Sequence, residues 1–207
     1  MSRLPGVSEA GDSFKRHRRD VVYEGRIFRV FRDGITLPNG VDTDYEVLEY
    51  PCAVSIIPVL ETEAGRQELV MVEQFRNAVG GVIHEIPAGM LKPDEVPLSC
   101  ARRELKEETG YTADRWTHVT TLFPTPGISG VTMIYFLAEG LEGGEQSLEE
   151  TECLEVRRVP VDDLVDAMVR GRDVDGVPRI VDGKTHVAVY YLAARSGCAA
   201  DGEAGSR

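Results

Sequence analysis

Hydrophobic and polar residues alternate near the start of the chain, a pattern typical of β-strands with one buried face. Between residues 21 and 50 the apolar positions lie on either side of Pro38-Asn39-Gly40, a combination typical of a tight turn. This pattern predicts a β-hairpin. Short runs rich in β-branched and aromatic residues predict five further strands, at residues 53–60, 68–75, 116–123, 131–138 and 153–159.

Helix start and stop signals mark three other segments. Pro97 suits a first helical turn, where its missing N–H is not needed, and Gly110 suits the left-handed position after a last turn. We therefore expect a helix over residues 97–109. A second helix is expected with Asp162 as its N-cap, and a third over residues 184–194. Strands interleaved with helices predict an α/β fold in which a mixed sheet packs between helices.

The helix expected at residues 97–109 carries a cluster of acids in its last turns. Glu104, Glu107 and Glu108 are three and four positions apart, so they share one stripe, where like charges repel each other and oppose the negative end of the helix dipole. A divalent cation removes both penalties, because Mg²⁺ and Mn²⁺ bind several oxygen ligands at once. The cluster indicates a metal site, and the simpler alternative is a solvated acidic face.

A longer pattern of fixed spacing surrounds these glutamates. Its positions are filled by Gly89, Glu95, Arg103, Glu104, Leu105, Glu107, Glu108 and Gly110. The chain therefore resembles the Nudix hydrolase family, whose box reads G-x5-E-x7-R-E-U-x-E-E-x-G-U with U a bulky apolar residue; Tyr111 departs from the usual aliphatic residue at the last U. The resemblance implies an enzyme that cleaves a nucleoside diphosphate linked to another moiety. It also implies the Nudix fold, an α/β/α sandwich with a mixed β-sheet.

Several stretches outside the box resemble the ADP-ribose pyrophosphatase branch of that family. They are Gly25-Arg26-Ile27, Tyr45-Glu46-Val47, Glu73-Gln74-Phe75-Arg76, Glu85-Ile86-Pro87-Ala88-Gly89, Pro124-Thr125-Pro126-Gly127 and Glu150-Thr151-Glu152. Pro126 matters most, because this branch has a proline sixteen residues after the last glycine of the box. The resemblance implies metal-dependent hydrolysis of the pyrophosphate bond of ADP-ribose to AMP and ribose 5-phosphate. The alternatives are a UDP- or GDP-sugar as substrate, and a non-catalytic domain that senses a nucleotide ligand.

The resemblance also implies roles for the residues of the box. Two or three Mg²⁺ ions, or Mn²⁺ ions, would be held by the carbonyl oxygen of Ala88 and by the carboxylates of Glu104, Glu107 and Glu108. Glu107 would bind a metal or hold a bridging water, so it also belongs to the catalytic set. Arg103 would belong to that set as the residue that orients the glutamates through charge-assisted hydrogen bonds, with Glu95 supporting it from behind.

Roles in substrate binding are implied for residues outside the box. Arg26, Ile27 and Glu46 would line an adenine pocket; the alternative is that Arg26 and Glu46 form an ordinary cross-strand pair. Arg76 would contact phosphate or the terminal ribose, and Glu85 would support the metal cluster or the substrate. Thr125 would complete the substrate-binding set.

The general base would come from an acidic loop. Glu150 and Glu152 both follow Gly143 and Gly144 in a segment that could close over the substrate, and the sequence does not choose between them. The simpler alternative is that the whole run 149–152 is a solvated loop.

Composition narrows the class of protein. The chain has 207 residues, with 23 Lys and Arg against 35 Asp and Glu, and the net charge of −12 argues against broad binding to DNA or RNA. No apolar run approaches the roughly 18 residues that span a membrane, and the N-terminus lacks the apolar region of a signal peptide. The four cysteines have neither CxxC pairing nor metal-ligand spacing. We expect a cytoplasmic enzyme with a small-molecule substrate.

The expected organisation has four parts. Residues 1–20 are expected to be a flexible N-terminal arm, whose basic cluster at residues 15–19 is either solvated or in contact with phosphate. Residues 21–52 would form an N-terminal β subdomain with the adenine pocket. In relatives this hairpin is exchanged between subunits, which implies a homodimer. Residues 53–195 would form the hydrolase domain, and 196–207 a disordered tail.

Overall fold

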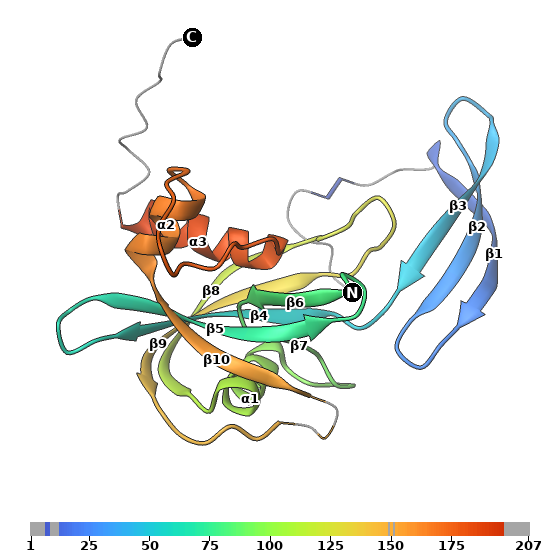
Figure 1. The fold of residues 1–207 in the computed structure, drawn as a ribbon. Helices are drawn as coiled ribbons and strands as arrows, with labels where there is room; N and C mark the ends of the chain where they lie inside the picture. The colour runs from blue at the N-terminus through green and yellow to red at the C-terminus, as the bar shows by residue number, and fades with distance from the viewer. Residues whose placement is uncertain (1–6, 9–12, 149, 151, 197–207) are drawn as a thin grey trace, which may run out of the picture. The chain divides into compact units, whose positions relative to one another are not determined.

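The structure is a computed structural model that describes residues 7–8, 13–148, 150 and 152–196 (Figure 1). The chain forms two compact units. Among the described residues, the first unit takes in those up to 53 together with 121–134, and the second takes in 54–120 and those from 135 onward. The segment 121–134, which the expected organisation kept within the hydrolase domain, belongs to the first unit.

The first unit contains a three-stranded antiparallel sheet in the order β1-β2-β3. Its strands are β1 (Lys15–Glu24), β2 (Arg29–Thr36) and β3 (Asp42–Glu49). The predicted hairpin is confirmed: Gly40 has a φ of 82° in the turn between β2 and β3, and its N–H donates to the Leu37 carbonyl at 2.9 Å. Glycine suits this turn because a side chain disfavours positive φ.

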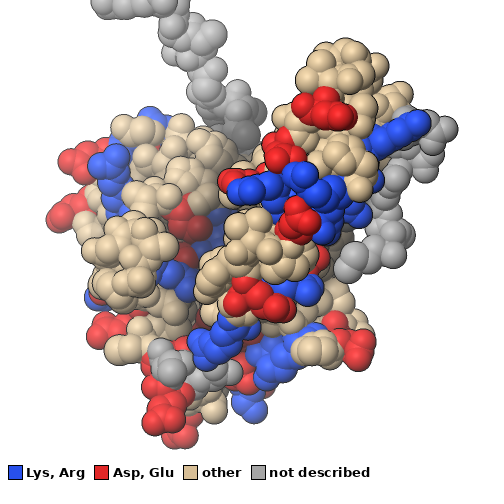
Figure 2. All heavy atoms as spheres, turned by 90° about the vertical axis from the view of Figure 1, so that its right-hand side faces the viewer, with Lys and Arg blue, Asp and Glu red and all other residues tan. Residues whose placement is uncertain are grey.

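Strand β1 changes the expectation for the N-terminal arm. Residues 15–20 form the first part of β1, paired with β2, whereas residues 1–6 and 9–12 lie outside the described residues. Arg19 donates from Nε to Oδ1 of the buried Asp33 at 2.6 Å, and this bond lowers the pKa of Asp33. Arg18 binds Asp44 at 2.8 Å. These cations already have carboxylate partners, which disfavours a phosphate-binding arm. Basic and acidic side chains are also intermingled on the face drawn in Figure 2.

The second unit is built on a mixed seven-stranded sheet with the order β10-β5-β4-β9-β8. Two short strands lie off this path, β6 on β5 and β7 on β4. The strands are β4 (Ala53–Glu61), β5 (Gln67–Arg76), β6 (Gly81–Glu85), β7 (Ala88–Met90), β8 (Thr112–Leu122), β9 (Met133–Glu142) and β10 (Leu154–Pro160). The centre of the sheet is the core, because every residue from 69 to 72 on β5 is buried.

Helices cover both faces of this sheet, as expected for an α/β/α sandwich. In Figure 1, α1 (Pro97–Thr109) lies on one side, and α2 (Val161–Met168) and α3 (Gly183–Arg195) lie together on the other. The bounds predicted for α1 are confirmed: Pro97 is in its first turn, and Gly110 follows with a φ of 75°. No helix among the described residues is long and apolar enough to cross a membrane.

One local prediction was wrong, and two short strands were missed. Asp162 is not an N-cap, because α2 begins at Val161 with Pro160 in the cap position, and Asp162 lies in the first turn. Strands β6 and β7 were not predicted. With five and three residues they are too short for an alternating pattern, and their pairing with β5 and β4 defines them.

Candidate active site

Helix α1 buries two of its glutamates. Glu104 and Glu108 are only 8% and 4% exposed, although each carries a carboxyl group, whereas the Glu107 side chain is 29% exposed. The two buried glutamates occupy one side of the helix together with Cys100, Ala101 and Leu105. A buried carboxylate is costly unless it is paired or bound to a cation, so their partners determine what this side of α1 can do.

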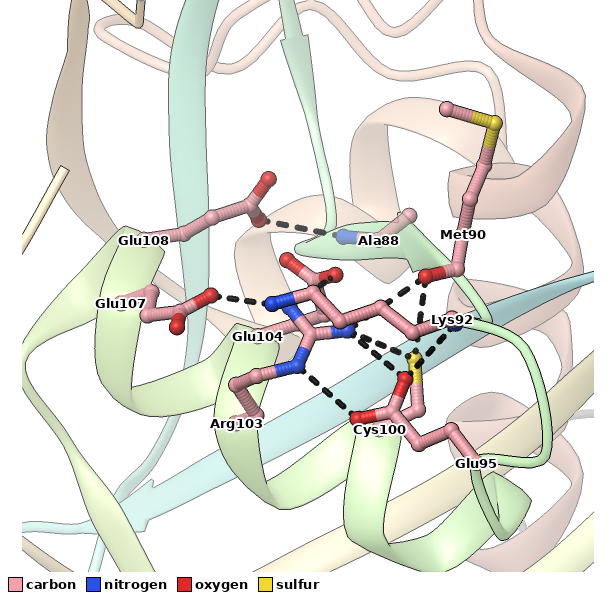
Figure 3. A network of polar contacts seen from close by, with 9 residues as sticks. All are labelled: Ala88, Met90, Lys92, Glu95, Cys100, Arg103, Glu104, Glu107 and Glu108. Carbon is pink, nitrogen blue, oxygen red and sulfur yellow. Dashed lines mark hydrogen bonds and ion pairs between the residues drawn. The ribbon is translucent and has the colours of Figure 1, made fainter. Parts of the chain in front are cut away.

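Arg103 lies at the centre of these acids (Figure 3). Its Nη1 donates to Glu104 Oε1 at 2.7 Å and to Glu107 Oε2 at 2.9 Å. Its other nitrogens form a two-point contact with Glu95, Nε to Oε1 at 2.9 Å and Nη2 to Oε2 at 3.0 Å. The guanidinium therefore holds three carboxylates at once.

Glu95 anchors this network from the segment before the helix. Besides Arg103, it accepts a hydrogen bond from the backbone N–H of Lys92 at 2.9 Å. The Arg103 bond, followed by the Lys92 bond, lowers the pKa of Glu95 to about 2. Glu95 is thus an ionised support for Arg103, and its place in Figure 3 is beside the arginine rather than among the carboxylates that face β7.

The segment that begins β7 approaches the buried acids closely. Glu108 Oε2 accepts a hydrogen bond from the backbone N–H of Ala88 at 3.1 Å. A Cβ placed on the next residue, Gly89, would lie 1.9 Å from Cδ of Glu104. Only glycine leaves room for the Glu104 carboxyl group here, which gives the first fixed position of the box a physical reason.

The pKa values of Glu104 and Glu108 indicate that this pair of acids suits a cation. Burial, followed by repulsion from Glu104, raises the pKa of Glu108 to about 8. Burial also raises the pKa of Glu104, against the opposing effect of Arg103. A divalent cation would favour both ionised forms, and carboxylate and carbonyl oxygens are the ligands that Mg²⁺ and Mn²⁺ prefer. The donor set therefore fits the expected metal.

The acids of α1 do not all point toward one common centre that could hold a metal ion. Within the described part of the chain, no three acidic, His or Cys side chains are grouped to hold an ion. Instead, Arg103 binds Glu104 and Glu107, and Glu108 turns to the Ala88 N–H. Metal binding would require these side chains to exchange some of those bonds.

A second charged network lies next to Glu108. Nε of Arg76, at the end of β5, donates to Oε1 of Glu85 at 2.6 Å, and Nζ of Lys184 on α3 binds the other oxygen of Glu85. Glu85 is only 2% exposed. The positive charge of Arg76 partly offsets the raised pKa of Glu108, so the structure brings Arg76, Glu85 and the box glutamates into one region.

The acidic loop between β9 and β10 is attached to the end of α1. Nε2 of Gln146 donates to the Glu108 carbonyl at 2.6 Å, and the Ser147 N–H donates to the Glu107 carbonyl at 3.0 Å. These bonds satisfy carbonyls that have no partner within the helix. The loop also passes close to Gly110, where a Cβ would lie 2.5 Å from the Gly144 carbonyl oxygen.

The two candidate bases in this loop differ in their surroundings. The negative charge of Glu152 raises the pKa values of Glu104 and Glu108, so Glu152 lies near both. It also precedes Leu154, which pairs with Gln74 on β5 and so brings the start of β10 beside the end that carries Arg76. Glu150 is exposed. Residues 149 and 151 lie outside the described residues.

The residues expected to bind adenine are only partly brought together. A hollow of about 410 Å³ in the first unit is lined by residues 24–29, which join β1 to β2, and by residues 49–51 after β3. Arg26 and Ile27 lie in this hollow and Glu46 does not. Glu46 lies opposite Arg32 on β2, 3.8 Å from its guanidinium, so the alternative of an Arg26–Glu46 cross-strand pair was wrong.

Thr125 lies in an exposed turn of the first unit. Its carbonyl accepts hydrogen bonds from the N–H groups of Ile128 and Ser129 at 3.1 and 2.9 Å. The Ile128 carbonyl in turn accepts from the Leu48 N–H on β3 at 2.7 Å. The turn is thus attached near the end of β3, from which the chain runs on to residues 49–51 of the hollow.

Sequence reasoning missed the contributions of α3 and of Gln146. Asp182 is the N-cap of α3 and accepts hydrogen bonds from the N–H groups of Lys184 and Thr185. An acid followed by an apolar helical pattern is a recognisable cap signal, so this start could have been found. The contact between Lys184 and Glu85 spans 99 positions, and nothing in the local sequence indicates it.

Comparison with known proteins gives matches over most of the chain. The NUDIX domain model matches residues 49–180. The ADP-ribose pyrophosphatase of Bacillus subtilis (strain 168) is 36% identical over 176 residues, which cover 84% of this chain and 89% of that protein. The GDP-mannose pyrophosphatase of Yersinia pestis (strain Pestoides F) is 36% identical over 134 residues, or 59% and 63% of the two chains.

A solved structure extends the likeness to the whole fold. The crystal structure of an ADP compounds hydrolase covers 93% of this chain and 99% of its own, with a TM-score of 0.75 and 22% sequence identity. At that identity the likeness concerns the fold alone, and the expected α/β/α architecture is confirmed.

Proposed function

Because the chain belongs to the Nudix family, we propose that it is a metal-dependent pyrophosphohydrolase that cleaves ADP-ribose to AMP and ribose 5-phosphate. The single observation that carries the proposal is the buried pair of acids on α1, Glu104 and Glu108, whose pKa values are raised by burial and which approach β7 at Ala88 and Gly89. Similarity to the Bacillus subtilis ADP-ribose pyrophosphatase over most of both chains supports the choice of substrate.

The metal would be held by Glu104, Glu108 and the carbonyl oxygen of Ala88, with Glu107 as a further ligand or as the holder of a bridging water. Mg²⁺ or Mn²⁺, in two or three copies, would neutralise the diphosphate and acidify the attacking water. Arg103 keeps Glu104 and Glu107 in place through its two Nη1 bonds. Glu95 in turn fixes Arg103.

Other side chains would handle the substrate and the proton. Arg76 would bind the diphosphate, because its side chain is 40% exposed, its guanidinium is held at Nε by Glu85, and its charge acts on Glu108. Glu152 would accept the proton of the water that attacks one phosphorus. The loop that carries Glu152 is fixed at one end by the bond from Gln146 to the Glu108 carbonyl and at the other by β10. These attachments limit how far Glu152 can move from the site.

The adenine would occupy the hollow of the first unit. Arg26 and Ile27 line this hollow, and Phe28 and Tyr50 add aromatic rings that could stack on a base. Glu46 has no place in this part of the proposal, since it faces Arg32 instead. Thr125 remains a candidate substrate contact through its turn beside β3.

A homodimer formed through the N-terminal sheet is also part of the proposal. Strand β1 is an edge strand that is exposed along its whole length, and Val21, Val22 and Tyr23 are each more than half exposed. Edge strands with apolar residues are usually covered by a partner. Sedimentation should therefore give the mass of a dimer.

A cytoplasmic location is supported by the free thiols of Cys52, Cys100 and Cys153.

A hydrolysis panel tests the proposed substrate. Wild-type protein with Mg²⁺ or Mn²⁺ is offered ADP-ribose, NADH, UDP- and GDP-sugars, dinucleoside polyphosphates and coenzyme A, and the products are identified. We expect the highest kcat/KM for ADP-ribose, with AMP and ribose 5-phosphate as products. Faster cleavage of GDP-mannose would favour the second candidate, to which the Yersinia pestis relative points. Ligand binding without turnover would favour a sensing domain.

Glutamine substitutions in the acidic loop test the base. Glu152→Gln should lower kcat by about 10²–10⁴-fold, the usual contribution of a general base. Glu150→Gln should have a small effect, because this side chain is exposed. Glu155→Gln is the matched control, since its side chain on β10 is 77% exposed. If all three variants lose activity equally and mildly, the base does not come from this loop.

A further inference from the structure

The first turn of α3 holds the end of β6 by two separate contacts. Nζ of Lys184 binds Glu85, and Oγ1 of Thr185 accepts a hydrogen bond from the Ile86 N–H at 2.9 Å. Asp182 stabilises the turn itself: it accepts from the N–H and the hydroxyl of Thr185 at 3.0 and 2.6 Å, and it lies 3.1 Å from Nζ of Lys184. A helix on one face of the sheet thereby fixes the segment that leads into β7.

Glu85 is the buried charge of this network, and its ionised form depends on its cationic partners for stabilisation. Its side chain is 2% exposed, and its two oxygens are divided between two cations, Arg76 on Oε1 and Lys184 on Oε2. Lys184 is the inner cation at 11% exposed, whereas Arg76 is 40% exposed. Removing one partner of a buried charge is costly, because the remaining charge is left in a medium that solvates it poorly.

The geometry at Arg76 connects this network with the substrate. The bond to Glu85 uses Nε, which lies nearest the aliphatic stem of the side chain. This bond fixes the guanidinium plane of a side chain that is 40% exposed. Arginine binds phosphate with two parallel N–H groups, and a fixed plane reduces the entropy lost on binding.

We propose that Lys184 is a positioning residue that, through Glu85, holds Arg76 in the orientation that binds the substrate diphosphate. This inference rests on the proposed function. With Lys184 present, Glu85 has a dedicated inner cation and only one oxygen facing Arg76. Without it, both oxygens of the buried carboxylate have Arg76 as their one cationic partner in this network. The guanidinium then turns toward Glu85 and away from the diphosphate.

The test compares Lys184→Met with the wild type in steady-state hydrolysis of ADP-ribose with Mg²⁺. We expect KM to rise roughly tenfold, the effect of losing about one well-placed hydrogen bond to a charged group, while kcat changes less than KM. Lys184→Arg restores the positive charge and should recover most of the loss. Binding of ADP-ribose in EDTA, measured by calorimetry, should weaken in Lys184→Met as well, which separates positioning of the diphosphate from metal chemistry.

A double-mutant cycle identifies the residue through which Lys184 acts. Arg76→Ala should raise KM by itself, and adding Lys184→Met to it should then raise KM little further. Thr185→Val is the matched variant, since it removes the other contact of the same turn with β6 and leaves Glu85 paired. Arg195→Met is the control for α3, because it removes an ion pair with Glu139 at the far end of the helix.

Three results would overturn the inference: full additivity of Lys184→Met and Arg76→Ala, an equal rise in KM for Thr185→Val, or unchanged KM in Lys184→Met. If Lys184→Met does not fold, Lys184→Gln takes its place, since Gln removes the positive charge but keeps an amide that can donate a hydrogen bond to Glu85. The same rise in KM is then expected, and an unchanged KM overturns the inference. Failure of the wild type to cleave ADP-ribose would instead count against the proposed function.

Discussion

Replacing Glu108 by Gln should lower kcat for ADP-ribose hydrolysis by roughly 10²–10³-fold, the usual effect of removing one preorganised electrostatic group from an active site. The same change should leave the protein folded. Gln keeps an oxygen that can accept the Ala88 N–H bond now made at 3.1 Å, and it has nearly the same volume. Kinetics with saturating Mg²⁺ measure the effect, and Glu155→Gln serves as the exposed control. Turnover at the wild-type rate would contradict the proposed metal site.

The stability of Glu108→Gln should rise although its activity falls. Burial and Glu104 raise the pKa of Glu108 from 4.5 to about 8. Between about pH 5 and pH 8 the folded protein therefore keeps a proton that the unfolded chain has released, so the free energy of unfolding falls as the pH rises. Gln has no such proton. In EDTA, the variant should melt above the wild type at pH 8.5, with a smaller difference at pH 5.5.

A divalent cation should reverse that order. Mg²⁺ or Mn²⁺ bound to the folded protein stabilises it by mass action, and the gain in Tm should be larger for the wild type than for Glu108→Gln. Thermal unfolding with increasing metal at pH 8.5 measures this. Equal gains in both proteins would mean that the cation binds elsewhere.

Replacing Gly89 by Ala should lower kcat by about 10²-fold, the effect expected when a catalytic group is displaced by about 1 Å. The added Cβ would lie 1.9 Å from Cδ and 2.0 Å from Oε1 of Glu104. These atoms end a flexible side chain, so the carboxyl group moves while the backbone stays in place. Activity should therefore fall much more than stability, as kinetics and thermal unfolding of the same preparation would show.

A double variant tests whether the effect acts through Glu104. Glu104→Gln alone should remove most of the activity, and adding Gly89→Ala to it should cost little more, since the displaced carboxylate is already absent. Gly183→Ala is the control, because a Cβ at that position meets nothing within 4 Å. If the losses multiply, or if Gly89→Ala retains wild-type kcat, the clash with Glu104 is not what requires glycine here.

Local signals in the sequence were sufficient for the framework of the site. Pro97 and Gly110 set the bounds of α1 because each acts on the backbone within one turn. The turn at residues 38–40 set the β2–β3 hairpin for the same reason. The spacing of the box identified the family, since it reflects which side chains one helix can present together.

Local signals failed where pairing between distant segments decides the outcome. The basic residues of β1 were expected in a flexible arm, because their sequence does not show that β2 pairs with them and supplies Asp33 as a partner. Glu46 was expected beside Arg26, yet the register of β2 and β3 places it opposite Arg32. A strand register depends on the whole sheet, and a shift of one residue moves every side chain to the other face.

The sequence by itself therefore determined the family of the chain, the bounds of α1 and the set of acids that this helix presents on one stripe. Only the tertiary structure decided that Glu104 and Glu108 are buried while Glu107 is partly exposed. It also decided that Glu152 lies near the buried pair while Glu150 is exposed, and that Lys184 on α3 balances Glu85. The physical reason is that burial and charge pairing are properties of packed neighbours. Those neighbours are up to 99 positions apart in the chain, whereas helix bounds and turns depend on adjacent residues.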